Sequence, residues 1–130
     1  VIEIRAYDTV YGVWKYFTVW EEQMNLERES YCLIGTLEAW NAMCQYFGRE
    51  KMIPVYIEVE DGTRLIRAVE RERTQEHPGY EELCRRFLAD AKDFSEENLK
   101  NAGITRRFEN KDMNACLEEI KLFIQKAILI

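Results

Sequence analysis

The chain has 130 residues, of which 47% are hydrophobic and 32% are charged, and its formal net charge is −6. This length and apolar content are sufficient for a packed core and exclude an intrinsically disordered chain. The acidic excess lies within residues 1–62, which carry 11 acidic and 5 basic side chains, so direct binding to nucleic-acid phosphates is not expected.

The four cysteines, Cys32, Cys44, Cys84 and Cys116, are isolated from one another. No CxxC pair is present to bind zinc or to exchange disulfides, and the sequence predicts neither a metal site nor a cofactor. Isolated thiols without a secretion signal are typical of a reducing compartment, so we expect a soluble, cytoplasmic protein. No apolar stretch approaches the roughly 18 residues that a membrane span needs, so no membrane association is expected.

The beginning of the chain predicts one strand and one ambiguous segment. Residues 1–7 (VIEIRAY) alternate between apolar and polar side chains, as a half-buried strand does. Residues 9–20 (TVYGVWKYFTVW) are rich in β-branched and aromatic residues, which favours a strand. Their apolar residues also fit helical spacing, so a helix is the alternative. We predict a strand because the β propensity extends over most of the segment.

The pattern changes from strand to helix between residues 31 and 48. Residues 31–34 (YCLI) predict a short strand. Residues 36–48 predict a helix that has Thr36 as its N-cap and that ends at Gly48.

Residues 52–73 predict a β-hairpin. Two runs of β-forming residues flank Asp61 and Gly62, a dipeptide that tolerates the positive φ angles of a two-residue turn. We therefore expect two antiparallel strands joined at this dipeptide.

Helices are expected after the hairpin. Apolar residues from Tyr80 to Ala91 recur at spacings of three and one, the stripe of an amphipathic helix. Ser95 is a suitable N-cap for a short helix, and a last helix runs from about Asp112 to the C-terminus. The expected fold class is α+β, a small single domain over residues 1–130 with a mainly antiparallel sheet built from hairpins and with three to four helices.

Residues 76–86 (EHPGYEELCRR) contain the only histidine of the chain. His77 is a candidate general base or metal ligand. The neighbouring residues are typical of a helix start, with Pro78 in the first turn, glutamates near the positive end of the helix dipole, and arginines four positions further on. Cys84 would face inward with the apolar stripe. We interpret the segment as a helix start.

Glu58 and Glu60 are the other catalytic candidates. On one face of the predicted hairpin, two carboxylates at this spacing can bind a divalent metal or divide the roles of acid and base. The lysine that metal-dependent nucleases usually add is missing, and Arg67 would lie diagonally across from Glu58 and pair with it. A solvated, salt-bridged sheet face is the preferred interpretation.

Three arginines of the predicted hairpin are candidate binding residues: Arg64, Arg67 and Arg71. Around a pocket, they could bind the phosphate of a nucleotide-like or other phosphorylated small molecule. Glutamates alternate with the arginines that follow, which argues against nucleic-acid binding, because neutralised arginines release few counterions.

Aromatic and acidic side chains are concentrated in and after residues 9–20. A strand in this segment has apolar side chains on both faces, so it is either covered on both sides or meets a partner. The acidic residues that follow favour a basic partner. The candidate binding residues of this surface are Trp14, Tyr16, Trp20, Glu21 and Glu22.

The sequence therefore predicts a binding or interaction protein without catalysis. We expect a homo-oligomer that engages a basic protein partner through the acidic, aromatic-rich surface. The alternative is a small enzyme or ligand-binding protein for a phosphorylated or nucleotide-like small molecule.

Overall fold

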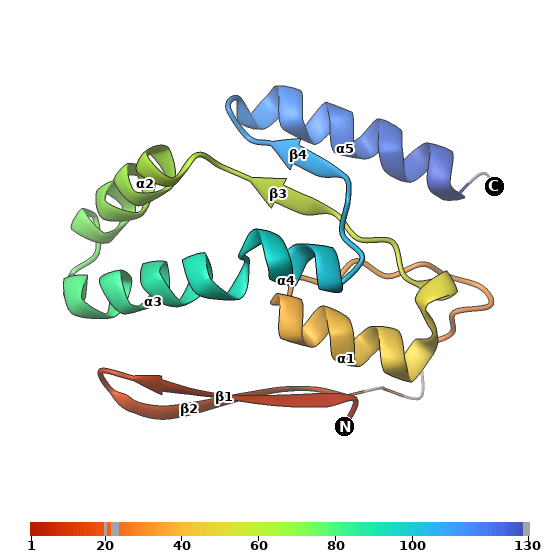
Figure 1. The fold of residues 1–130 in the computed structure, drawn as a ribbon, viewed down its shortest axis with the longest axis horizontal. Coiled ribbons are helices and arrows are strands. Elements are labelled where there is room, and N and C mark those ends of the chain that lie inside the picture. The colour runs from red at the N-terminus through yellow and green to blue at the C-terminus, as the bar shows by residue number, and fades with distance from the viewer. Residues whose placement is uncertain (20, 22–23, 129–130) are drawn as a thin grey trace. The chain divides into compact units, whose positions relative to one another are not determined.

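A computed structural model of the chain describes residues 1–19, 21 and 24–128. The chain divides into two compact units, Val1–Met52 and Ile53–Ile130, and each contains both helices and strands (Figure 1). Two compact units can belong to one domain, so the single domain expected over the whole chain stays a prediction.

The first unit is a β-hairpin followed by a helix. Its elements are β1 (Glu3–Thr9), β2 (Gly12–Thr18), α1 (Leu37–Phe47) and the 3₁₀ helix η1 (Arg49–Lys51). The strands are antiparallel, with Ile4 opposite Phe17, and the positive φ of 113° at Gly12 lets the chain reverse between them. The strand predicted within residues 9–20 is confirmed for β2.

The helix α1 begins and ends where the sequence predicts. The hydroxyl of Thr36 accepts a hydrogen bond from the N–H of Ala39, and Gly48 adopts a φ of 95° at the C-terminal end. Arg5 of β1 donates a further hydrogen bond to the Thr36 hydroxyl, which joins α1 to the hairpin. The strand predicted over residues 31–34 is wrong, because these residues have no regular secondary structure and pair with no strand among the described residues.

The second unit packs helices around a short parallel strand pair. Its elements are β3 (Tyr56–Glu58), α2 (Asp61–Arg73), α3 (Tyr80–Asp93), α4 (Glu96–Asn101), β4 (Arg107–Glu109) and α5 (Met113–Ile128). Phe108 of β4 is fully buried, and the ring of Phe123 on α5 meets it edge-on with 5.2 Å between the ring centroids. Figure 1 shows α5 alongside β4, and α2 beside α3. The other buried hydrophobic residues described in this unit are Leu83, Leu99, Ile104 and Cys116.

The hairpin predicted over residues 52–73 is wrong. Only β3 is a strand, and the residues of the predicted turn begin the helix α2. The reason is Glu60, whose carboxylate accepts hydrogen bonds from the N–H groups of Gly62 and Thr63 and so caps a helix. Asp61 adds a favourable negative charge in the first turn.

The fold class is α+β, as predicted, but the predicted sheet is wrong in size and type. The described residues form two separate two-stranded sheets, one antiparallel (β1–β2) and one parallel (β3–β4). They also form five α-helices rather than three to four, because α2 replaces the second strand of the predicted hairpin. Among these residues, no helix combines the length and the apolar content that crossing a bilayer requires.

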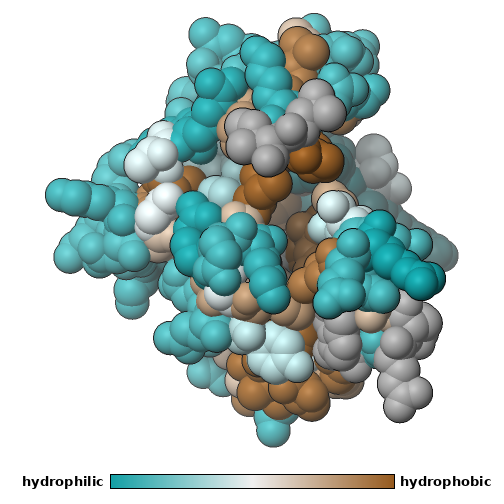
Figure 2. All heavy atoms as spheres, turned by 90° about the vertical axis from the view of Figure 1, so that its right-hand side faces the viewer, coloured by the Kyte–Doolittle hydropathy of each residue, from teal (hydrophilic) through white to brown (hydrophobic). Residues whose placement is uncertain are grey.

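Large hydrophobic side chains reach the surface of both units. Figure 2 shows hydrophobic residues among hydrophilic ones on the side of the molecule that it draws. In the second unit, Leu88 of α3 and Met113 of α5 are each 70% exposed. Isolated exposed residues of this kind are normal, so only a contiguous set on one element suggests a contact surface.

Candidate functional site

One face of the β1–β2 hairpin is apolar and open to solvent. Ile4, Val13 and Phe17 lie on this face and are between 61% and 63% exposed. Arg5, which binds the N-cap of α1, points to the opposite face because neighbouring residues of a strand alternate. We call this surface the open face, and its residues are Ile4, Ala6, Asp8, Val13, Lys15 and Phe17.

The opposite face of the hairpin carries the predicted binding residues Trp14 and Tyr16, which are 44% and 45% exposed. Tyr16 meets Tyr7 edge-on with 5.8 Å between ring centroids, and the Arg5 guanidinium lies 5.8 Å from the centre of the Tyr16 ring. Trp14 stacks on Tyr11 at 6.0 Å. These aromatic residues therefore pack within the hairpin, and their role in binding stays a prediction.

The acidic residues that follow β2 are described in part. Glu21 is exposed, and its carbonyl oxygen accepts a hydrogen bond from the N–H of Met24. Trp20 and Glu22, the other binding candidates here, lie outside the described residues.

A turn after this segment holds two more exposed glutamates. The Asn25 side chain accepts a hydrogen bond from the N–H of Glu27. The Tyr31 hydroxyl accepts one from the N–H of Asn25 and donates one to the carboxylate of Glu29 at 2.8 Å. Glu27 and Glu29 are thus presented by an ordered turn, and with Glu21 they form what we call the acidic flank.

His77 lies in the exposed connection between α2 and α3. Neither a hydrogen bond nor an ion pair joins it to another described residue, and these residues contain no cluster of three His, Cys, Asp or Glu side chains that could hold a metal. The helix start predicted here is confirmed, with a shift: Gly79 is the N-cap of α3, so Pro78 precedes the first turn rather than lying in it. Nothing in the geometry assigns His77 a role.

The orientation of α3 differs from the prediction. Leu83 is buried, whereas Cys84, predicted to face inward, is exposed. Glu82 is buried instead, where Arg85 binds its carboxylate at 2.6–3.0 Å. Phe87, one turn after Leu83, lies under the guanidinium of Arg64 on α2 at 4.0 Å, so this side of α3 faces α2. The side of the apolar stripe that carries Cys84 is therefore exposed to solvent.

Glu58 does not share a catalytic pair with Glu60. Arg107 of β4 binds the Glu58 carboxylate at 2.6 Å and also binds Glu96 of α4. The predicted pairing of Glu58 with Arg67 is wrong, because Arg67 lies on a helix instead of the neighbouring strand. Glu58 therefore ties β3 to β4.

Glu60 acts as the N-cap of α2. Its carboxylate accepts hydrogen bonds from the N–H of Thr63 at 2.8 Å, from the N–H of Gly62 at 2.9 Å and from the Thr63 hydroxyl at 2.9 Å. These hydrogen bonds lower the pKa of Glu60, and the bond from the Thr63 N–H has the largest effect. A carboxylate held ionised in this way is suited to capping and poorly suited to acting as a general acid.

The structure brings together the three arginines that the sequence singled out. Arg64, Arg67 and Arg71 lie on one face of α2 and line an open hollow of about 520 Å³, which we call the arginine hollow. Arg67 donates hydrogen bonds to the backbone carbonyl oxygens of Asn110 at 2.9 Å and Lys111 at 3.2 Å. Helical spacing, rather than the predicted sheet face, is what groups these arginines.

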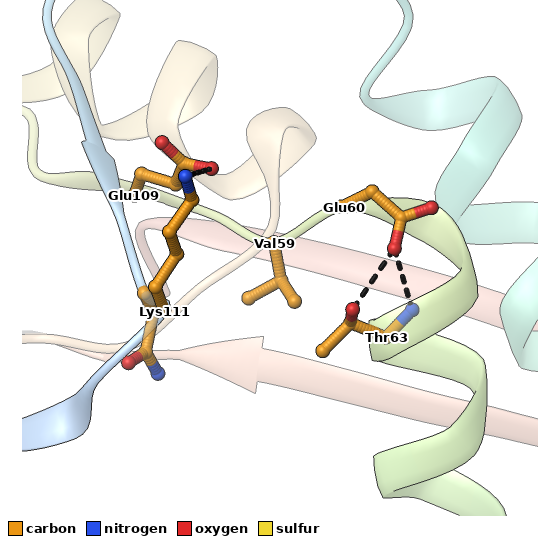
Figure 3. Close-up of a pocket in the computed structure, with 6 residues that line it drawn as sticks. Val59, Glu60, Thr63, Glu109 and Lys111 are labelled. Atoms are coloured by element: carbon orange, nitrogen blue, oxygen red, sulfur yellow. Dashed lines mark hydrogen bonds and ion pairs between the residues drawn. The ribbon is translucent and has the colours of Figure 1, made fainter.

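A second hollow of about 370 Å³ adjoins the first and shares Val59 and Asn110 with it. Figure 3 shows Val59 between the cap of α2 on one side and the Glu109–Lys111 ion pair on the other. The side-chain oxygen of Asn110 is buried and has no hydrogen-bond partner among the described residues. An unsatisfied buried oxygen is costly, so this atom is an acceptor that lacks a donor.

No protein-family model, curated protein or solved structure matches the chain. Its function is therefore inferred from the side chains themselves.

Sequence reasoning missed Asn110 and Lys111. They follow β4, which has three residues and is too short to be detected by alternation. They reach the hollows only because β4 pairs with β3. The one available signal, Asn-Lys-Asp after a mixed-charge segment, is typical of a turn and predicts no site.

Proposed function

We propose that the protein is a non-catalytic interaction protein that self-associates through the open face of the β1–β2 hairpin. The proposal rests on the exposure of Ile4, Val13 and Phe17, three large apolar side chains on one face of an isolated strand pair. A two-stranded hairpin is marginally stable by itself, and α1 is bonded to the opposite face. Covering the open face would remove apolar surface from water.

The proposed occupant of the open face is a second copy of the chain. Asp8 lies toward the hairpin turn on this face, and Lys15 lies two residue pairs further from the turn. In a two-fold symmetric dimer every contact occurs twice, so a pairing of Asp8 in one copy with Lys15 in the other would form two ion pairs. The open face thus carries two opposite charges that can pair with those of a second copy, in addition to its apolar side chains.

The size of the open face indicates how strong such a dimer would be. Strands of seven residues give a face of roughly 24 Å by 10 Å, which is well below the roughly 800 Å² per partner of a standard interface. We therefore expect a weak dimer whose population rises with protein concentration.

Charge exchange on the open face tests the proposal by sedimentation velocity over a range of protein concentrations. Asp8→Lys and Lys15→Glu should each shift the equilibrium toward monomer, because each places like charges together. The double variant carrying both changes should restore association. A wild-type protein that stays monomeric at every concentration would overturn the proposal.

An apolar variant with a matched control completes the test. Phe17→Ser should weaken association, whereas Leu88→Ser, which removes a similarly exposed side chain from α3, should not. Circular dichroism checks that both variants keep their secondary structure. Equal loss of association in both would mean that the open face is not the contact surface.

The acidic flank supports a further part of the proposal, a basic protein partner. A labelled lysine-rich peptide, followed by fluorescence anisotropy, is the probe. Reversing the charge of Glu27 and Glu29 should weaken binding several-fold, whereas reversing Glu81 and Glu97, exposed glutamates of the second unit, should not. Equal effects of the two pairs would show that binding follows net charge and not this surface.

A further inference from the structure

The two adjoining hollows beside α2 have opposite chemical character. Arg64, Arg67 and Arg71 line the first, where Glu70 is the one acidic side chain among the described lining residues. The second is lined by acceptors, including the carboxylate of Glu109, with Lys111 as its one basic residue. Both volumes fall within the range of small-molecule sites in proteins. One elongated ligand could therefore contact cations at one end and acceptors at the other.

The cations at the arginine end are available to an anion. Among the described residues, Arg67 and Arg71 form no ion pair with a carboxylate. Arg64 contacts the Asp61 carboxylate at 3.5 Å and stacks on Phe87 at 4.0 Å. Arg67 is held in place by the carbonyl oxygens of Asn110 and Lys111, which fixes its orientation without neutralising its charge. Guanidinium groups bind phosphate oxygens with short, charge-assisted hydrogen bonds.

One acceptor at the second hollow lacks a donor. Asn110 lines both hollows, and its buried side-chain oxygen has no hydrogen-bond partner among the described residues. Once the Asn110 side chain turns to expose this oxygen, a ligand hydroxyl would supply the missing donor. The exposed carboxylate of Glu109 could accept a second hydroxyl from the same ligand.

The residues that line the hollows also indicate which chemical group the ligand does not contain. None of the described residues that line them is aromatic, and Val59 is their one apolar side chain. A nucleotide base usually stacks on an aromatic ring, whereas a polyol needs only hydrogen-bonding groups. The surroundings therefore favour a sugar over a base.

We propose that the two hollows form one binding site for a small sugar phosphate. The phosphate lies against Arg67 and Arg71, and a sugar hydroxyl donates to the side-chain oxygen of Asn110. The residues of this site belong to the second unit and those of the open face to the first, so the protein would bind a metabolite as well as a second copy of itself.

Calorimetric titration with glucose 6-phosphate, inorganic phosphate, glucose and adenosine monophosphate tests the proposal. The sugar phosphate should bind at least tenfold more tightly than phosphate or glucose alone, because only it engages both ends. Absence of heat with glucose 6-phosphate at millimolar concentration would overturn the proposal. Tighter binding of the nucleotide would overturn the assignment to a sugar.

Variants separate the two ends of the site. Arg71→Gln should weaken glucose 6-phosphate and inorganic phosphate by about tenfold, since a hydrogen bond to a charged group is lost. The control is Arg73→Gln, an exposed arginine of the same helix that does not line the hollow, and it should leave both affinities unchanged. Equal effects of the two changes would show general charge attraction rather than a site.

The hydroxyl contact has its own variant. Asn110→Ala should weaken glucose 6-phosphate several-fold and leave inorganic phosphate unchanged, because phosphate alone does not reach the acceptor end. The backbone hydrogen bonds that Asn110 makes with Glu58 and Arg67 remain possible in this variant. Unchanged binding of the sugar phosphate would show that Asn110 does not contact the ligand.

Discussion

Nη1 of Arg5 lies 3.2 Å from Oγ1 of Thr36, so a single hydroxyl binds both the hairpin and the first turn of α1. The Arg5 guanidinium also binds the carboxylate of Glu3 at 2.9 Å, and Thr18 donates a hydrogen bond to the same carboxylate. Glu3 is buried, so this charge depends on its partners. The polar cluster therefore joins the two parts of the first unit.

Changes at Thr36 test this link. Thr36→Ala removes the N-cap and an acceptor of Arg5, so it should lower the free energy of unfolding by about 1–2 kcal/mol. Thr36→Ser keeps the hydroxyl and should cost much less. Urea denaturation followed by circular dichroism measures both, and equal losses would show that the hydroxyl is not the stabilising group.

The cap of α2 predicts a pH dependence. The hydrogen bonds from Thr63 and Gly62 hold the pKa of Glu60 below its ordinary value of 4.5. As the pH falls, the unfolded chain binds the proton first, so the stabilisation is present above 4.5 and is lost as the pH falls through the lower pKa of the folded state. The difference in unfolding free energy between wild type and Glu60→Gln should therefore shrink as the pH is lowered.

The control for this measurement is Glu76→Gln, an exposed glutamate outside the helices. Its difference from wild type should stay nearly constant over the same pH range. A difference for Glu60→Gln that is equally constant would contradict the capping role.

The core of the second unit depends on Phe108. Phe108→Ala should lower the unfolding free energy by about 3–5 kcal/mol, because it leaves a cavity beside Phe123 where a fully buried ring had packed. Leu88→Ala, at an exposed position of α3, should change it by less than about 0.5 kcal/mol. Chemical denaturation compares the two, and similar small effects would mean that the core lies elsewhere.

Thiol labelling tests the orientation of α3. Cys32 and Cys84 are exposed, Cys116 is buried, and burial raises the pKa of the Cys44 thiol although Arg49 acts in the opposite direction. Because the thiolate is the reactive form, iodoacetamide should modify the two exposed cysteines first and Cys116 only on unfolding. Peptide mass spectrometry gives the order. Early protection of Cys84 would support the inward orientation that the sequence suggested.

Features set by neighbouring residues could be predicted from the sequence. Thr36 and Ser95 were predicted as N-caps, and both accept the expected hydrogen bond from the N–H three residues later. The strand β2 followed from β-branched and aromatic propensity. In each case the decisive interaction lies within a few positions along the chain.

The sequence-based predictions are wrong where a local pattern is compatible with two structures, or where a strand pairs with a segment that is distant in the sequence. Asp61 and Gly62 suit a tight turn, yet they also suit the first turn of a helix once Glu60 caps it. No local pattern indicates that β3 pairs with β4, because each has only three residues. The sequence singled out Arg64, Arg67 and Arg71, but it placed them on a hairpin, so their grouping on one face of a helix was not predicted. The position of Asn110 beside them was not predicted either, since it depends on the pairing of β3 with β4.

The parallel pairing of β3 with β4 also has a consequence for folding. Glu58 and Arg107, which bind each other across the pair, are separated by 49 positions, whereas the hairpin of the first unit joins strands that are adjacent in the chain. Closing a long segment has a larger entropic cost, so contacts of this kind form late. The hairpin, which can form within roughly 10 μs, should precede β3–β4 pairing. The arginine hollow, which needs Asn110 in place, should therefore be among the last features of the second unit to assemble.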